Sequence, residues 1–137
     1  MIEINYPLVL IATFAQFILG ALWYSPILFG KTWMKIMENT DSPEQMKKKS
    51  KAMTPFYLLQ LVLTLFTTIN LATLITLLPS FSSYTLAFYI LLGFIIPTQI
   101  GAVVWANTKK KFWIKQILLM TTYSFVGIML AAWILGM

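Results

Sequence analysis

The sequence contains neither cysteine nor histidine among its 137 residues, and both absences restrict its chemistry. Without cysteine there is no disulfide, no thiol nucleophile and no sulfur-ligated metal. Without histidine the chain lacks the side chain that most often titrates near neutral pH and most often binds a metal ion. We therefore expect no metal site, no cofactor and no catalytic residue, and a protein that is not an enzyme.

Charged residues are also scarce, because they make up 10% of the chain while hydrophobic residues make up 59%. Soluble domains have about 25% charged and about 45–50% apolar residues, so little of this surface suits water. The acidic residues, none of which lies in an apolar run, are Glu3, Glu38, Asp41 and Glu44. Ion-coupled transport usually uses a carboxylate inside the membrane, and we do not expect that mechanism here.

Long apolar runs dominate what is present. A helix rises 1.5 Å per residue, so about 20 apolar residues cross the hydrocarbon core of a bilayer. Four runs are long enough, at 6–24, 55–78, 84–105 and 112–135. The first is expected to be a retained span rather than a cleaved signal, since Glu3 and no lysine precedes it. The predicted fold is all-α: one membrane domain over residues 1–137 that forms an integral membrane four-helix bundle.

The lysines lie on one side of this predicted bundle. They occur in the 25–54 loop and around the loop before the fourth span, whereas the N-terminus and the 79–85 loop have none. By the positive-inside rule both lysine loops are cytoplasmic and both termini lie outside. The net charge of +6 therefore indicates topology and contact with the lipid bilayer, including anionic lipid, rather than nucleic acid. The residues expected at the interface are Phe29, Trp33, Lys47, Lys48, Lys49, Lys109, Lys110 and Lys111.

The 25–54 loop is expected to hold short helices. Pro26 disfavours helix at Ser25, so the first span either kinks and continues through 26–37 or ends near Tyr24. We favour the second outcome, with Ser25 as the N-cap of an amphipathic interfacial helix and Pro26 as its first residue. Further along, Ser42 with Gln45 has the spacing of a capping box and predicts another helix start.

Small and polar residues within the spans are the candidates for a ligand site. Ala12, Gln16, Gly20 and Tyr24 recur at four-residue intervals, as do Gly93, Pro97, Gly101 and Trp105. Interhelical packing and an aromatic belt at the membrane interface would explain most of them. The functional alternative is that Gln16, Asn70, Gln99 and Tyr24 converge on a cavity opened by Pro97. For the aromatics, the alternative is a pocket in which Trp23 and Tyr24 meet Trp105. The candidate ligand-binding residues are Gln16, Gly20, Trp23, Tyr24, Asn70, Pro97, Gln99 and Trp105.

The stretch from Gly20 to Trp33 reads G-A-x-W-Y-S-P-x-x-F-G-K-x-W. In this motif, in its length and in its four-span layout, the chain resembles a bacterial membrane protein family catalogued as domain of unknown function 1761. The resemblance implies a small multi-pass protein of the bacterial cytoplasmic membrane. It implies no activity and no catalytic residue.

Two functions remain after these exclusions. The first is a non-enzymatic protein that binds or transports a small apolar or weakly polar molecule as a homo-oligomer, most simply a dimer, because four spans enclose little volume. The second is an accessory subunit that docks a partner protein or anionic lipid through residues 26–53. A membrane enzyme is disfavoured, because apart from Lys115 the spans offer only hydroxyls and amides.

Overall fold

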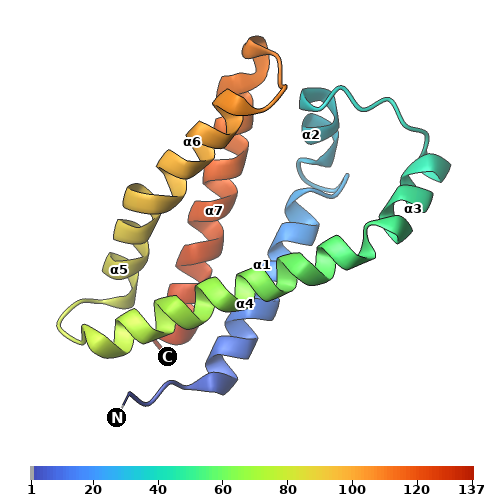
Figure 1. Ribbon diagram of the computed structural model, residues 1–137. Coiled ribbons are helices and arrows are strands. Elements are labelled where there is room, and N and C mark those ends of the chain that lie inside the picture. Colours follow the sequence, from blue (N-terminus) through green and yellow to red (C-terminus); the bar gives the residue numbers. More distant parts are fainter. Residues whose placement is uncertain (1) are drawn as a thin grey trace.

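A computed structural model describes residues 2–137, and over that range every regular element is a helix (Figure 1). The elements are α1 Tyr6–Trp23, α2 Gly30–Ile36, α3 Pro43–Ala52, α4 Thr54–Leu77, α5 Ser83–Ile90, the π-helical turn η1 Leu91–Ile95, α6 Ile96–Trp105, the 3₁₀ turn η2 Lys110–Phe112 and α7 Trp113–Leu135. The predicted all-α class is confirmed.

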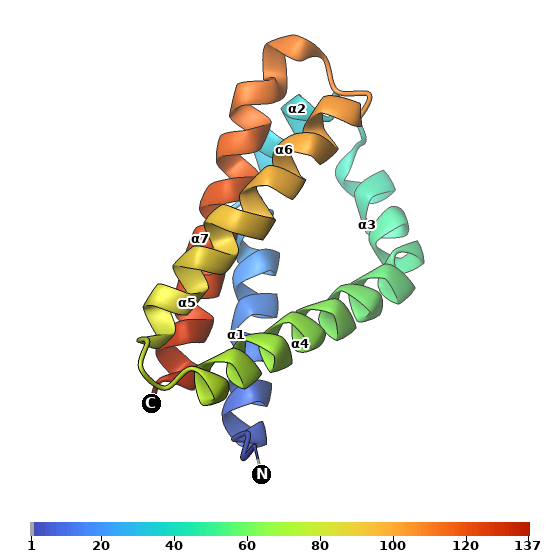
Figure 2. The same cartoon turned by 60° about the vertical axis from the view of Figure 1, so that its left-hand side comes forward.

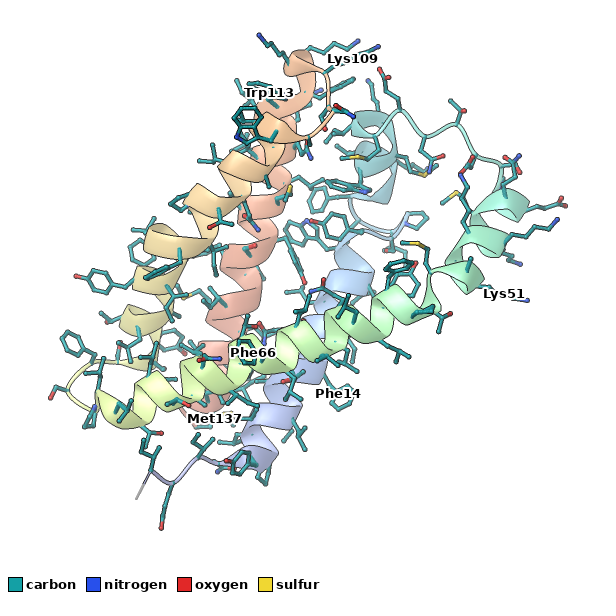
Figure 3. The ribbon with its side chains drawn as sticks, viewed as in Figure 1. Phe14, Lys51, Phe66, Lys109, Trp113 and Met137 are labelled. Atoms are coloured by element: carbon teal, nitrogen blue, oxygen red, sulfur yellow. The ribbon has the colours of Figure 1, made fainter. Side chains whose placement is uncertain are left out.

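Four of the helical segments are long and apolar enough to cross a membrane: Tyr6–Trp23, Thr54–Leu77, Ser83–Trp105 and Lys110–Leu135. They agree closely with the four apolar runs of the sequence, and the third consists of α5, η1 and α6 in continuous succession. Large apolar side chains such as Phe14 and Phe66, which Figure 3 labels, are more than half exposed. Outward-facing apolar side chains suit hydrocarbon rather than water, and the protein is a multi-pass membrane protein.

The bundle is organised around α7, which packs against α1, α5 and α6. In Figures 1 and 2, α4 lies obliquely across α1, and both termini lie at the same end of the molecule as the α4–α5 loop. The main buried cluster joins α1, α4, α5 and α7, and four of its members are alanines: Ala12, Ala87, Ala131 and Ala132. Small residues let membrane helices approach closely, and the resulting van der Waals packing stabilises their association in lipid.

The junction between α1 and α2 is a tight backbone turn. Phe29 N–H donates to Trp23 O at 2.9 Å, and Gly30 N–H donates to Ser25 O at 2.8 Å. The predicted N-cap at Ser25 is therefore wrong: α2 begins at Gly30, and the Ser25 hydroxyl donates to Leu22 O instead. These two hydrogen bonds close the backbone from residue 23 to residue 30 into one turn. Pro26 lies within that turn and not in a helix.

The apolar face of α2 packs onto the bundle. Ile36 is only 2% exposed and forms a cluster with Trp23 and Leu119. The Trp33 ring lies 5.1 Å from the Tyr24 ring, and the Phe29 ring lies 4.7 Å from the Trp23 ring. Both rings thus make contacts within the protein, while Phe29 remains 38% exposed, and contact of Phe29 and Trp33 with lipid stays a prediction.

The end of α2 is tied to the loop between α6 and α7. Asn39 N–H donates to Met34 O and Glu38 N–H to Lys35 O, which closes the helix as a Schellman motif. Glu38 takes the left-handed conformation, φ 53°, that glycine usually supplies there. Its carboxylate accepts from Lys109 Nζ at 2.8 Å, and this hydrogen bond holds the pKa of Glu38 below its usual value. Lys109 therefore forms an ion pair with Glu38, although its side chain remains largely exposed.

Helix α3 begins as the sequence predicts. Ser42 Oγ accepts from Gln45 N–H at 3.3 Å and Gln45 Oε1 accepts from Ser42 N–H at 2.9 Å, so the capping box is confirmed. No residue of α3 is buried, and its principal neighbour is α4. Lys47 and Lys48 are exposed there, while Lys49 pairs with Asp41.

Candidate functional site

A cavity of about 380 Å³ lies between α1, α4, η1 and α7. Its polar lining comes from amides and hydroxyls: Gln16, Gln60, Thr64, Thr67, Thr68, Tyr123 and Ser124. Its apolar lining comes from Leu63, Leu71, Ile90, Phe94, Ile95, Gly127, Ile128 and Ala131. None of these side chains carries a formal charge, so the cavity is suited to an uncharged occupant.

Gln16 and Thr68 form the hydrogen-bonded wall of the cavity between α1 and α4. Gln16 Nε2 donates to Thr68 Oγ1 at 2.8 Å and to the carbonyl of Ala12 at 3.1 Å. The Thr68 hydroxyl in turn donates to Thr64 O at 2.7 Å. Within residues 2–137, Gln16 Oε1 takes part in no hydrogen bond, although the residue lines the cavity. The Gln16 side chain is therefore held in place with a free acceptor.

Tyr123 forms the opposite wall, on α7. Its ring lies 5.5 Å from the Tyr24 ring and 6.0 Å from the Trp23 ring. Gly20 makes room for its phenol group, because a Cβ at Gly20 would lie 2.8 Å from the Tyr123 hydroxyl oxygen. Within the described residues this hydroxyl has no hydrogen-bond partner, although Tyr123 lines the cavity. The Tyr123 hydroxyl is therefore a free donor that lies beside Gly20 of α1.

Ser124, the neighbour of Tyr123, connects the cavity to α6. Its Oγ accepts from Gln99 Nε2 at 2.6 Å. Gln99 itself does not line the cavity, and it positions Ser124 through this hydrogen bond. Gln99 Oε1 is buried and lacks a partner among the described residues. The prediction that Gln99 points into the cavity is corrected to a supporting role.

The π-helical turn η1 shapes the cavity rim. Ile96 N–H donates to Leu91 O, five residues back, which adds a residue to the turn just before Pro97. Such π turns occur mostly as single insertions in helices and often at functional sites. Phe94 and Ile95 of this turn line the cavity.

Pro97 itself does not line the cavity. That it opens the site stays a prediction. It is exposed, and it shares an outward stripe with Gly93 of η1 and Gly101 of α6. A Cβ added at either glycine would meet no atom within 4 Å. This stripe faces away from the bundle.

Two other predicted residues also do not line the cavity. Asn70 is exposed and its side-chain amide donates to Phe66 O of its own helix, so α4 presents Thr68 rather than Asn70 to Gln16. Trp105 is 89% exposed at the end of the outward stripe, so it cannot pack with Trp23 and Tyr24. Tyr123 takes the place predicted for Trp105. Trp23 and Tyr24 contact Tyr123 without lining the cavity themselves.

Sequence reasoning missed Tyr123, Ser124 and Thr68. A signal for two of them was present, since Tyr123 and Ser124 are adjacent polar residues in the middle of the last apolar run. The threonines at 64 and 68 share the four-residue interval of the stripe in the first span. Placing these residues around one cavity requires knowing how each helix is rotated about its own axis. The spacing of residues in the sequence does not give that rotation.

The lysines before α7 cluster at the end of the bundle opposite the termini, where Figure 3 labels Lys109 and Trp113. Lys110 Nζ lies 5.9 Å from the centroid of the Trp113 ring, and Lys111 Nζ lies 4.9 Å from that of Phe112. Trp113 Nε1 donates to Thr108 O at 3.0 Å. Exposed cations over aromatic rings at a span end are typical of the boundary between hydrocarbon and headgroups.

Comparison with known proteins gives a single assignment. No curated protein and no solved structure matches the chain. A family model described as "Protein of unknown function (DUF1761)" matches residues 8–136, a range that includes every residue of the cavity and the whole α1–α2 junction. This confirms the family resemblance noted in the sequence, and the chain belongs to the DUF1761 family.

Proposed function

We propose that this protein binds a small, uncharged, weakly polar molecule inside the membrane, in the cavity between α1, α4, η1 and α7. The observation that carries the proposal is that one cavity is lined by both Gln16 and Tyr123. Within the described residues, Gln16 Oε1 and the Tyr123 hydroxyl take part in no hydrogen bond. A polar group without a partner is costly in an apolar medium, so a complementary ligand would be stabilised there. The volume of about 380 Å³ falls within the usual range for small-molecule sites.

Binding rather than catalysis is proposed because of the kinds of groups that line the cavity. Amides and alcohols orient a ligand by hydrogen bonds, but they do not exchange protons readily near neutral pH. Transport and homodimer formation stay predictions. The alternative of an accessory subunit that docks a partner protein or anionic lipid through residues 26–53 also stays a prediction, supported by the exposed Lys47 and Lys48 of α3.

Filling the cavity tests the binding proposal. Thr67 lines the cavity and its hydroxyl bonds only within α4, to Thr64 O at 2.9 Å, so Thr67→Phe places a large ring in the cavity at small structural cost. We expect native mass spectrometry of the protein released from nanodiscs to find a bound small molecule, and Thr67→Phe to lose it. Thr98→Phe is the matched control, because Thr98 is exposed on α6 and bonds only to Phe94 O.

The proposal fails if the unmodified protein carries no such molecule, or if Thr67→Phe retains it as well as Thr98→Phe does. Circular dichroism of both variants shows whether the helices are intact. A folded Thr67→Phe protein without ligand, beside a loaded Thr98→Phe protein, is the expected result.

We propose further that the protein resides in a bacterial cytoplasmic membrane with both termini outside and the 25–54 loop in the cytoplasm. Ser80 is exposed in the α4–α5 loop and, within the described residues, its side chain makes no hydrogen bond. We expect Ser80→Cys, in this cysteine-free chain, to react with a membrane-impermeant maleimide added to intact cells. Ser50→Cys on α3 is the control and should react only after lysis; the reverse pattern would overturn the orientation.

A further inference from the structure

We infer that the ligand of this cavity is a neutral single-chain amphiphile, with a compact hydrogen-bonding head and an apolar chain, which reaches the cavity sideways from the bilayer. This inference rests on the proposed function and specifies its ligand. The buried polar groups, the apolar rim and the uncharged lining of the cavity support it.

Hydrogen bonds between helices hold the more buried polar groups of the cavity lining. Thr68 is 2% exposed and accepts from Gln16 Nε2, while Ser124 accepts from Gln99 Nε2. The first bond fixes Gln16 and the second fixes Ser124 in the lining, and Gly20 leaves space for the Tyr123 hydroxyl. A head group placed here would therefore meet a preformed acceptor and a preformed donor.

The rim is different in character. Leu63 of α4 is 50% exposed and Phe94 of η1 is 73% exposed, yet both line the cavity. Both lie in the middle part of their spans, Thr54–Leu77 and Ser83–Trp105. In Figures 1 and 2 the first half of α4 diverges from α6 toward α3, so the two sides of the rim come from helices that separate. An apolar opening at this depth faces hydrocarbon, not water.

Two polar side chains of α4, Gln60 and Thr67, also belong to the lining near this rim. Gln60 Nε2 donates to Thr64 Oγ1 at 3.4 Å and Thr67 Oγ1 donates to Thr64 O, so each has a partner in its own helix. Gln60 Oε1 has no partner among the described residues either, but Gln60 and Thr67 are exposed whereas Thr68 is buried. The more enclosed groups are therefore the stronger site for a head group.

The chemistry of the head follows from the free groups. It must accept from a phenol and donate to an amide oxygen, and a hydroxyl or a primary amide does both. An alkane does neither. A quaternary ammonium or an ionised carboxylate would be buried with no opposite charge in the lining, which is strongly unfavourable. The volume of about 380 Å³ is near the lower end for ligand sites and limits the chain to a short one.

The test uses 1-octanol carrying an aliphatic diazirine, with the full-length protein in phosphatidylcholine nanodiscs. After irradiation, peptide mass spectrometry should locate the label on cavity-lining residues of α4, η1 and α7. Excess 1-octanol or octanamide should displace the label, whereas octane and octyltrimethylammonium should not. Tyr123→Phe should weaken displacement by octanol about fivefold, the effect of one hydrogen bond, and Tyr6→Phe on the exposed start of α1 should not change it.

The outcomes separate this inference from the proposed function. Displacement by octane as readily as by octanol, or displacement by octyltrimethylammonium, would overturn the inference. So would a Tyr123→Phe protein that binds octanol as the unmodified protein does. If native mass spectrometry finds a bound molecule but the diazirine does not label the cavity, the amphiphile is wrong and the binding proposal stands. If both experiments find an empty cavity, both proposals fail.

Discussion

Replacing Gly30 with alanine should lower the free energy of unfolding by about 3 kcal/mol, the upper end of the range for overpacking a tight site. A Cβ at Gly30 would lie 2.5 Å from Ser25 C and 2.6 Å from the carbonyl oxygens of Ser25 and Tyr24. These neighbours are backbone atoms of the turn that Gly30 N–H closes by donating to Ser25 O. They cannot rotate away as a side chain can, so the turn itself must open.

Two measurements follow the effect of Gly30→Ala. Denaturant unfolding in detergent micelles, monitored by circular dichroism, reports the global loss. The rate of tryptic cleavage after Lys31 and Lys35 of α2 reports local opening, since a detached α2 becomes accessible even while the spans stay folded. Faster cleavage and a lower unfolding midpoint are the expected results.

Gly101→Ala is the matched control. A Cβ at Gly101 would meet no atom within 4 Å, and Gly101 lies inside α6, where alanine favours helix by up to about 1 kcal/mol over glycine. The same substitution should therefore leave stability unchanged or slightly raise it. Equal losses for the two variants would show that the α1–α2 turn does not depend on close backbone contact at Gly30.

The features that sequence predicted well are those set by local chemistry. The spans are fixed by long apolar runs with few charges, and α3 begins at a capping box whose partners, Ser42 and Gln45, are three residues apart. The start of α2 was missed because Ser25-Pro26 is a good local helix start. A backbone contact between Gly30 and residues 24–25 overrides it.

Helix rotation could not be predicted with the same success. In a soluble helix, polar residues mark the outer face, but here the lipid-facing surface is apolar and the pattern disappears. The first span was oriented correctly because Gln16 needs a partner, which Thr68 supplies. The third span was not, because glycine and proline tolerate lipid as well as protein, and so Pro97 and Trp105 turned out to face outward.

Trp23→Ala should have the largest effect on stability, a loss of about 3–5 kcal/mol as for other buried aromatic truncations. Trp23 is 8% exposed, and its ring lies 4.7 Å from Phe29 and 6.0 Å from Tyr123, so it joins the α1–α2 turn to α7. Within residues 2–137 its Nε1 has no hydrogen-bond partner. The loss is therefore one of packing, and Trp23→Phe, which keeps an aromatic ring, should recover part of it. Denaturant unfolding in micelles measures all three proteins.

Trp105→Ala separates packing in the protein from a general effect of tryptophan at the membrane boundary. Trp105 is 89% exposed at the end of α6, so it can contribute only as an interfacial anchor in lipid. In micelles its removal should change stability by less than about 0.5 kcal/mol, as for other surface substitutions. If the two tryptophans proved equally important, Trp105 would have to pack against the protein, as the sequence pattern first suggested. A loss confined to Trp23 would instead place the aromatic contact beside the cavity at Tyr123, since Trp23 and Tyr123 share that packing while Trp105 does not.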